Sequence, residues 1–129
     1  MPAKTVAHLV TEAKARVENL SPASVGAEMA AGDVLLVDPR EHEERQQNGC
    51  IPGALHAPRG RLEFYADPTS AYHRPELDPA RRIILSCASG SRSALAAGAL
   101  QGLGYARVAH LDGGLKAWRE AGLAVEAGS

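Results

Sequence analysis

The stretch that decides the fold of this chain is Ile83-Ile84-Leu85-Ser86-Cys87-Ala88-Ser89-Gly90-Ser91-Arg92-Ser93. Its first three residues form an apolar run of the kind that makes a buried parallel strand. An alanine-rich segment at about residues 93–103 follows and predicts a helix. The turn between them is short, and its Gly90 permits a positive φ. The stretch therefore predicts a strand, a tight turn and a helix, with Cys87 at the carboxyl end of the strand.

Further strands and helices are predicted on both sides of this stretch. The other predicted strands are apolar runs at residues 34–37, 54–56 and 108–111. The other predicted helices lie at about residues 22–32, 41–47, 61–65 and 115–120, the first of them capped by Ser21 and ending near Gly32. Strands and helices that alternate in this way predict an α/β fold, a parallel sheet with helices on both faces.

The N-terminal segment predicts one additional helix. Apolar residues recur there at steps of four and three, which draws one stripe along a helix at about residues 5–19. We expect residues 1–20 to be an amphipathic helical extension and residues 21–125 to be the main domain. The apolar stripe is compatible with a helix that packs on that domain and also with a dimer contact. The stripe alone does not distinguish these two possibilities.

The composition bounds the function classes. The 129 residues suffice for one domain with a core. With 14 Lys and Arg against 15 Asp and Glu, we expect neither nucleic acid nor membrane as a partner. The chain begins without the pattern of a signal peptide, so a cytoplasmic location is expected. Two cysteines and five scattered histidines predict no disulfide framework and no metal site. We also expect no cofactor.

Cys87 is the candidate nucleophile. A short loop of small residues can turn successive backbone N–H groups toward the sulfur, and the helix that follows adds the positive end of its dipole. Both effects favour the thiolate, which is the reactive form of cysteine. Arg92 supplies a cation beside the loop. A single cysteine is more often an inert buried hydrophobe, but here the strand, the glycine turn, Arg92 and the helix occur in the order that reactivity needs.

Four segments together resemble the successive signatures of the rhodanese family. They are Leu36-Val37-Asp38-Pro39-Arg40-Glu41, Gly49-Cys50-Ile51-Pro52-Gly53-Ala54, Cys87-Ala88-Ser89-Gly90-Ser91-Arg92-Ser93 and Asp112-Gly113-Gly114-Leu115-Lys116-Ala117-Trp118. The resemblance covers about residues 21–123. It implies a rhodanese-like parallel α/β sheet and a single-domain sulfurtransferase.

The resemblance also implies roles for particular residues. Cys87 would carry a persulfide and pass sulfur from thiosulfate or a similar donor to cyanide or a thiol, as in a thiosulfate sulfurtransferase. Residues 88–93 (Ala88, Ser89, Gly90, Ser91, Arg92 and Ser93) would bind the substrate. Asp38 and Arg40 would hold the active-site loop. His56 and Arg59 follow the second signature and are expected at the rim of the pocket.

Three alternatives stay open at this point. A non-catalytic persulfide carrier would use the N-terminal helix to dock a protein acceptor of sulfur. A cysteine-dependent phosphatase or arsenate reductase is less favoured, because the related enzymes have five residues between Cys and Arg and this chain has four, Ala88 to Ser91. Cys50 stands where many family members have His, and it is either a resolving thiol or a residue packed behind a loop.

Overall fold

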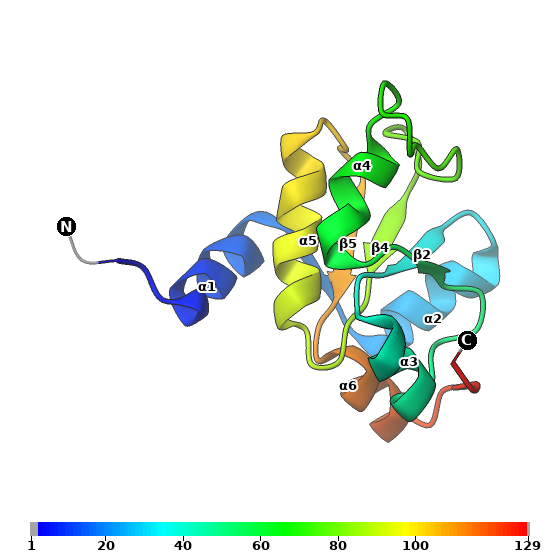
Figure 1. The fold of residues 1–129 in the computed structure, drawn as a ribbon. Coiled ribbons are helices and arrows are strands. Elements are labelled where there is room, and N and C mark those ends of the chain that lie inside the picture. Colours follow the sequence, from blue (N-terminus) through cyan, green and yellow to red (C-terminus); the bar gives the residue numbers. More distant parts are fainter. Residues whose placement is uncertain (1–2, 129) are drawn as a thin grey trace.

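Five parallel strands form one sheet in residues 3–128, the part of the chain that the computed structural model describes (Figure 1). The strands are β1 (Glu18–Leu20), β2 (Leu35–Asp38), β3 (Leu55–His56), β4 (Ile83–Leu85) and β5 (Val108–Leu111). Their order in the sheet is β1-β5-β4-β2-β3. The α/β fold class and the parallel sheet predicted from sequence are confirmed.

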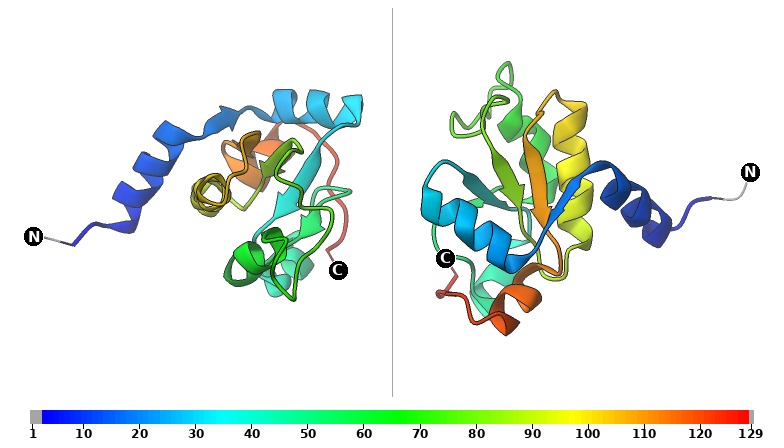
Figure 2. Two further views of the ribbon diagram at one scale, coloured as in Figure 1. Left: turned by 90° about the horizontal axis from the view of Figure 1, so that it is seen from above. Right: turned by 180° about the vertical axis from the view of Figure 1, so that it is seen from behind.

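Helices cover both faces of this sheet (Figures 1 and 2). They are α1 (Val6–Arg16), α2 (Pro22–Ala31), α3 (His42–Asn48), α4 (Leu62–Ala66), α5 (Ser91–Gly102) and α6 (Gly114–Glu120), with a 3-10 turn, η1, at Arg59–Arg61. Helices α4 and α5 lie on one face, whereas α2 and α6 lie on the other (Figure 2). Within residues 3–128, no helix combines the length and apolar character that a membrane crossing requires.

The core has two layers because neighbouring side chains of a strand point to opposite faces. In β4, Ile83 and Leu85 pack with Leu100 of α5. Ile84, between them, packs on the opposite face with Val25 of α2 and Trp118 of α6. Strand β4 is therefore buried on both sides, which is why its sequence is an unbroken apolar run.

The N-terminal segment differs from the sequence prediction. The predicted helix ended at about residue 19, but α1 ends at Arg16, and β1 then adds an edge strand beside β5. The Asn19 amide donates hydrogen bonds to the carbonyls of Lys14, at 2.9 Å, and Val17, at 3.0 Å. These bonds satisfy carbonyls that the end of a helix leaves without partners, so the chain can leave the helix here and join the sheet.

The sheet brings three chain segments to one edge. Parallel strands place their carboxyl ends together, and ligands of open α/β sheets collect at that edge. Here β2 leads into α3, β4 leads into Ser86 and Cys87, and β5 leads into the turn before α6. Strand β4 is the middle strand of the five, so Cys87 lies at the centre of this edge.

Candidate active site

The Cys87 sulfur lies inside a ring of hydrogen-bond donors. The backbone N–H of Gly90 donates to Sγ at 3.1 Å, and that of Ser93 donates at 3.3 Å. Gly90 has φ +102° and is the N-cap of α5, so the turn directs these amides inward. Ser93 Oγ lies 3.4 Å from the same sulfur. Backbone dipoles and the N-terminus of a twelve-residue helix thus converge on one sulfur atom, an arrangement that favours negative charge there.

The sulfur is more enclosed than the sequence suggested. The small side chains of Ala88, Ser89 and Ser91 are compatible with an open pocket, but Cys87 is only 1% exposed, although Ser89 and Ser91 beside it are exposed. The small residues let the loop close tightly on the sulfur instead of leaving space over it. Burial alone would fit an inert cysteine, but the two amides aimed at Sγ distinguish this site from a packed core residue.

The first turn of α6 supports the Cys87 loop through backbone hydrogen bonds. The backbone N–H groups of Leu115 and Lys116 donate to the carbonyls of Cys87, at 2.8 Å, and Ala88, at 3.1 Å. Gly114 makes this close contact between the two backbone segments possible. Its φ is +59°, and a Cβ there would lie 2.5 Å from the Cys87 carbonyl oxygen. The glycines of the fourth sequence signature thus allow two backbone segments to touch.

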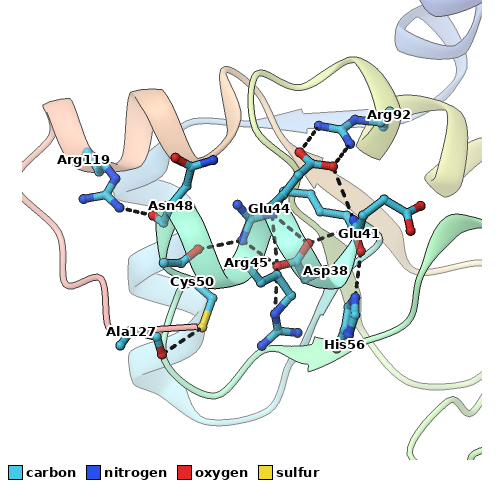
Figure 3. A network of polar contacts seen from close by, with 12 residues as sticks. Asp38, Glu41, Glu44, Arg45, Asn48, Cys50, His56, Arg92, Arg119 and Ala127 are labelled. Carbon is cyan, nitrogen blue, oxygen red and sulfur yellow. Dashed lines mark hydrogen bonds and ion pairs between the residues drawn. The ribbon is translucent and has the colours of Figure 1, made fainter. Parts of the chain in front are cut away.

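Arg92 is fixed by a partner that sequence analysis did not identify. Its guanidinium forms two hydrogen bonds with the Glu44 carboxylate of α3, at 2.5 and 2.8 Å (Figure 3). Glu44 raises the pKa of Arg92, and the Asp38 carboxylate adds to that effect. Arg92 in turn holds the pKa of Glu44 below its ordinary value. A fixed cation therefore lies within electrostatic range of the sulfur.

Asp38 and Arg40 lie at the end of β2 and are both buried. The Arg40 guanidinium donates to Asp38 Oδ2 at 2.8 Å and to the carbonyl of Gly49 at 2.9 Å. Arg45 Nε lies 3.8 Å from the same carboxylate oxygen (Figure 3). The contacts of Asp38 and Arg40 thus brace the segment between β2 and α3, and the ion pair from this edge to the Cys87 loop comes from Glu44 of α3.

His56 and Arg59, expected at the rim of the pocket, are held by other groups. His56 Nε2 lies 2.7 Å from the carbonyl oxygen of Arg40 (Figure 3). The Arg59 guanidinium donates to Glu63 at 2.6 Å, one turn along the chain. The structure places neither of them in the hollow described next.

A hollow of about 240 Å³ lies beside the active-site loop. It is lined by Ala88 of the loop and by Arg40, Asn48, Leu115, Lys116 and Arg119. Lys116 and Arg119 lie one turn apart on α6, and sequence analysis did not select either of them. The location of ligand sites at the carboxyl ends of parallel strands indicated the turn before α6. Only the packing of α6 against Ala88 shows that the basic side chains of α6 border the site.

Cys50 is not one of the residues around the Cys87 sulfur. Its backbone pairs with Glu126 in an antiparallel bridge, and its sulfur is directed toward the carbonyl of Ala127, at 4.0 Å (Figure 3). Both cysteines are free thiols. Cys50 is therefore packed behind the C-terminal segment.

Within residues 3–128, no group of three or more His, Cys, Asp or Glu side chains is arranged to hold a metal ion.

Comparisons with known proteins agree with this architecture. The Rhodanese-like domain family matches residues 21–121. A sulfurtransferase of Allochromatium vinosum is 38% identical over 95 residues, which cover 74% of this chain and 80% of that protein. A domain-sized part of the thiosulfate sulfurtransferase of Pseudomonas aeruginosa superimposes with a TM-score of 0.76 and 30% identity, covering 92% of this chain and 22% of that one.

A protein of unknown function from Rhodopseudomonas palustris is similar over nearly the whole chain. It has a TM-score of 0.90 and 39% identity, and the match covers 98% of this chain and 99% of that one. That protein is described as a possible tyrosine phosphatase. The family match spans most of the chain, and the Allochromatium relative is a sulfurtransferase. This chain therefore belongs to the rhodanese-like domain family, and its relatives support sulfur transfer as its general activity.

Proposed function

We propose that the protein is a sulfurtransferase that moves a sulfane sulfur from thiosulfate, or a similar donor, through a persulfide on Cys87 to cyanide or a thiol. The observation that carries the proposal is the pair of backbone N–H groups, from Gly90 and Ser93, that donate to Cys87 Sγ. A ring of donors around one sulfur stabilises a thiolate before the reaction and a charged persulfide after it.

The proposed reaction has two half-reactions. In the first, the Cys87 thiolate attacks the outer sulfur of thiosulfate, the bond between the two donor sulfurs breaks, and sulfite leaves with the electron pair. In the second, cyanide attacks the terminal persulfide sulfur, thiocyanate leaves, and the Cys87 thiolate returns. Ala88, Ser89, Gly90, Ser91, Arg92 and Ser93 form the proposed substrate-binding loop. No metal or cofactor takes part in either step.

The charges around the site support an anionic donor. Arg92 is held near the sulfur by Glu44, and Lys116 and Arg119 line the hollow beside Ala88. We assign this hollow to the sulfonate end of the donor, since the loop residues Ala88 and Ser89 carry no positive charge. Asp38 and Arg40 keep their proposed supporting role, because they fix the β2–α3 segment from which Glu44 reaches the loop.

The proposal is tested by incubating the protein with thiosulfate and weighing it intact. We expect a gain of one sulfur atom, which is lost on addition of cyanide with formation of thiocyanate. The Cys87→Ser variant should show no gain. Cys50→Ser, the same substitution at the other cysteine, should keep it, because Cys50 faces the C-terminal segment. A wild-type protein that gains no sulfur from thiosulfate or a polysulfide would contradict the proposal.

Two further assays separate the alternatives. Turnover of an aryl phosphate that exceeds turnover of thiosulfate would favour phosphatase chemistry, which the description of the Rhodopseudomonas relative suggests for that protein. Loading without turnover to cyanide or small thiols, together with rapid transfer to one protein acceptor, would favour a persulfide carrier. Multiple turnovers with thiosulfate and cyanide would exclude a carrier role alone.

A further inference from the structure

A chain of side-chain hydrogen bonds extends from the Cys87 sulfur across the sheet to the N-terminal segment. Ser93 Oγ lies 3.4 Å from Cys87 Sγ and 2.9 Å from His110 Nδ1. His110 Nε2 lies 2.6 Å from Asn19 Oδ1. Ser93 and His110 are completely buried. The residues come from α5, β5 and β1, so the chain exists only in the folded sheet.

The register of the sheet explains how these residues meet. Asn19 of β1 pairs with His110 of β5, which in turn pairs with Leu85 of β4, two residues before Cys87. Paired residues on neighbouring strands point to the same face. That face is the one covered by α5, whose first turn carries Ser93.

The hydrogen-bond partners of Asn19 fix which atom donates and which accepts at each step of this hydrogen-bond chain. The Asn19 amide nitrogen donates to the carbonyls of Lys14 and Val17, so its oxygen faces His110 and accepts from Nε2–H. In a neutral imidazole, Nδ1 is then an acceptor. The Ser93 hydroxyl therefore donates to His110 Nδ1, and a lone pair of Ser93 Oγ faces the Cys87 thiol.

We propose that His110 exchanges a proton with Cys87 through the Ser93 hydroxyl, as a positioning residue for the reactive thiolate. The thiol proton passes to Ser93 Oγ while the Ser93 hydroxyl proton passes to His110 Nδ1. Ser93 is unchanged by this exchange, Cys87 becomes a thiolate that accepts from Ser93, and His110 becomes an imidazolium that donates from both nitrogens. No other reactant is needed.

The surroundings of His110 agree with a group that is neutral at rest. Burial lowers the pKa of His110 below its ordinary value, so Nδ1 holds a free lone pair at neutral pH. The charged groups near the ring are Asp112, after β5, which opposes this shift, and Lys14 of α1, which adds to it. Cys87, reached through Ser93, completes the set, because a thiolate there would stabilise the imidazolium of His110.

This inference deepens the proposed function, and its test does not depend on sulfur transfer. The test measures the rate at which iodoacetamide alkylates Cys87 as a function of pH, with Cys87 and Cys50 separated by peptide mass spectrometry. In His110→Asn, an amide oxygen still accepts from Ser93 but takes up no proton. We expect the midpoint of the Cys87 profile to rise by about one pH unit, which slows alkylation about tenfold below that midpoint.

Two controls sharpen this test. His73→Asn is the matched substitution, because His73 is partly buried and its ring Nε2 lies 3.2 Å from the carbonyl oxygen of Leu77, outside the Cys87 hydrogen-bond chain. It should leave the Cys87 profile unchanged. Ser93→Ala removes the link, so it should raise the midpoint, and adding His110→Asn to Ser93→Ala should raise it no further. An unchanged midpoint in a folded His110→Asn variant, or additive shifts in the double variant, would overturn the inference.

A second measurement needs no variant of His110. The ¹⁵N chemical shifts of the His110 ring are followed by NMR against pH, before and after Cys87 is alkylated. Alkylation replaces the thiolate by a neutral thioether, so the midpoint of His110 should fall. An unchanged His110 midpoint would also overturn the inference. If thiosulfate adds no sulfur while both profiles shift as expected, the proposed function fails and the proton exchange stands.

Discussion

Gly114 is the residue at which backbone packing sets the shape of the active-site loop. The N–H groups that follow it, of Leu115 and Lys116, donate to the carbonyls of Cys87 and Ala88. A side chain at Gly114 would meet the backbone of Cys87 and Ala88 at 2.5 to 2.7 Å, and φ there is +59°. Backbone atoms cannot move aside as the end of a flexible side chain can, so the loop itself must shift.

We predict that Gly114→Ala lowers the free energy of unfolding by about 1 to 3 kcal/mol, because it adds backbone strain and a close contact. The same substitution should reduce persulfide formation, since the ring around Cys87 is displaced. Chemical denaturation and intact mass after thiosulfate loading measure the two effects.

Gly98→Ala is the matched control for this prediction. Gly98 lies inside α5, its backbone has no positive φ, and a Cβ there has nothing within 4 Å. Alanine is the better helix former by about 0.5 to 1 kcal/mol, so this variant should be as stable as the wild type or more stable. Equal destabilisation by the two substitutions would show that the contacts of Gly114 do not matter.

At the scale of elements, Tyr105 connects three parts of the chain. It lies between α5 and β5 and is 2% exposed. Its hydroxyl donates to the carbonyl of Ala66, at the end of α4, at 2.7 Å. It also lies 3.0 Å from the carbonyl of Leu77, in the long loop between α4 and β4. This buried hydroxyl therefore anchors a segment that has little regular structure of its own.

The pH dependence of stability should reveal this anchor. Burial raises the pKa of Tyr105 from its ordinary value of 10.0 to about 12. Because the pKa is higher in the folded state, the contribution of the phenol to stability is complete below pH 10 and is lost as the pH rises through about 12. We predict that Tyr105→Phe costs about 1 to 3 kcal/mol at pH 8, since two buried carbonyls lose a donor.

The measurement for this prediction is denaturant unfolding at several pH values. The difference between wild type and Tyr105→Phe should be constant below pH 10 and should shrink above it. Tyr72→Phe is the control, because Tyr72 is 63% exposed, and it should change stability by less than about 0.5 kcal/mol. A difference that stays the same up to pH 12 would contradict the assigned cause.

Most elements could be predicted from the sequence, and the exceptions have a physical reason. Strands β4 and β5 were predicted with their observed bounds, because strands buried on both faces are continuous apolar runs. Strand β1 was missed. Its residues Glu18, Asn19 and Leu20 show no apolar run, and they form a strand because β5 offers them a free edge. Local pattern does not encode a strand that depends on its neighbour.

For the whole molecule, the distribution of charge matters more than its sum. The net charge is −1, yet Arg40, Lys116 and Arg119 line the hollow beside Ala88. The sequence therefore predicted no strong overall field, whereas the fold gathers basic side chains from α6 and the β2–α3 segment at one place. Such a local field attracts small anions and weakens as salt screens it.

We predict that Lys116→Gln raises the KM for thiosulfate several-fold and leaves kcat nearly unchanged, because the side chain would attract the donor without touching the reacting sulfur. The increase should become smaller at high ionic strength. Steady-state kinetics with thiosulfate and cyanide at two salt concentrations measure this. Lys4→Gln is the matched control, because Lys4 pairs with Glu12 of α1, outside the hollow. An equal effect of both substitutions would rule out a local donor site.

The sequence by itself determined the class of fold, the family and the candidate nucleophile. Apolar runs, glycine turns and short signatures are local features, and each can be read within about a dozen residues. The tertiary structure alone decided which distant groups meet at Cys87: Glu44 against Arg92, Lys116 and Arg119 around the hollow, and Ser93, His110 and Asn19 in one hydrogen-bonded chain. These contacts join residues up to 91 positions apart. They depend on the register of parallel strands and on the way helices pack over them, which no local pattern specifies.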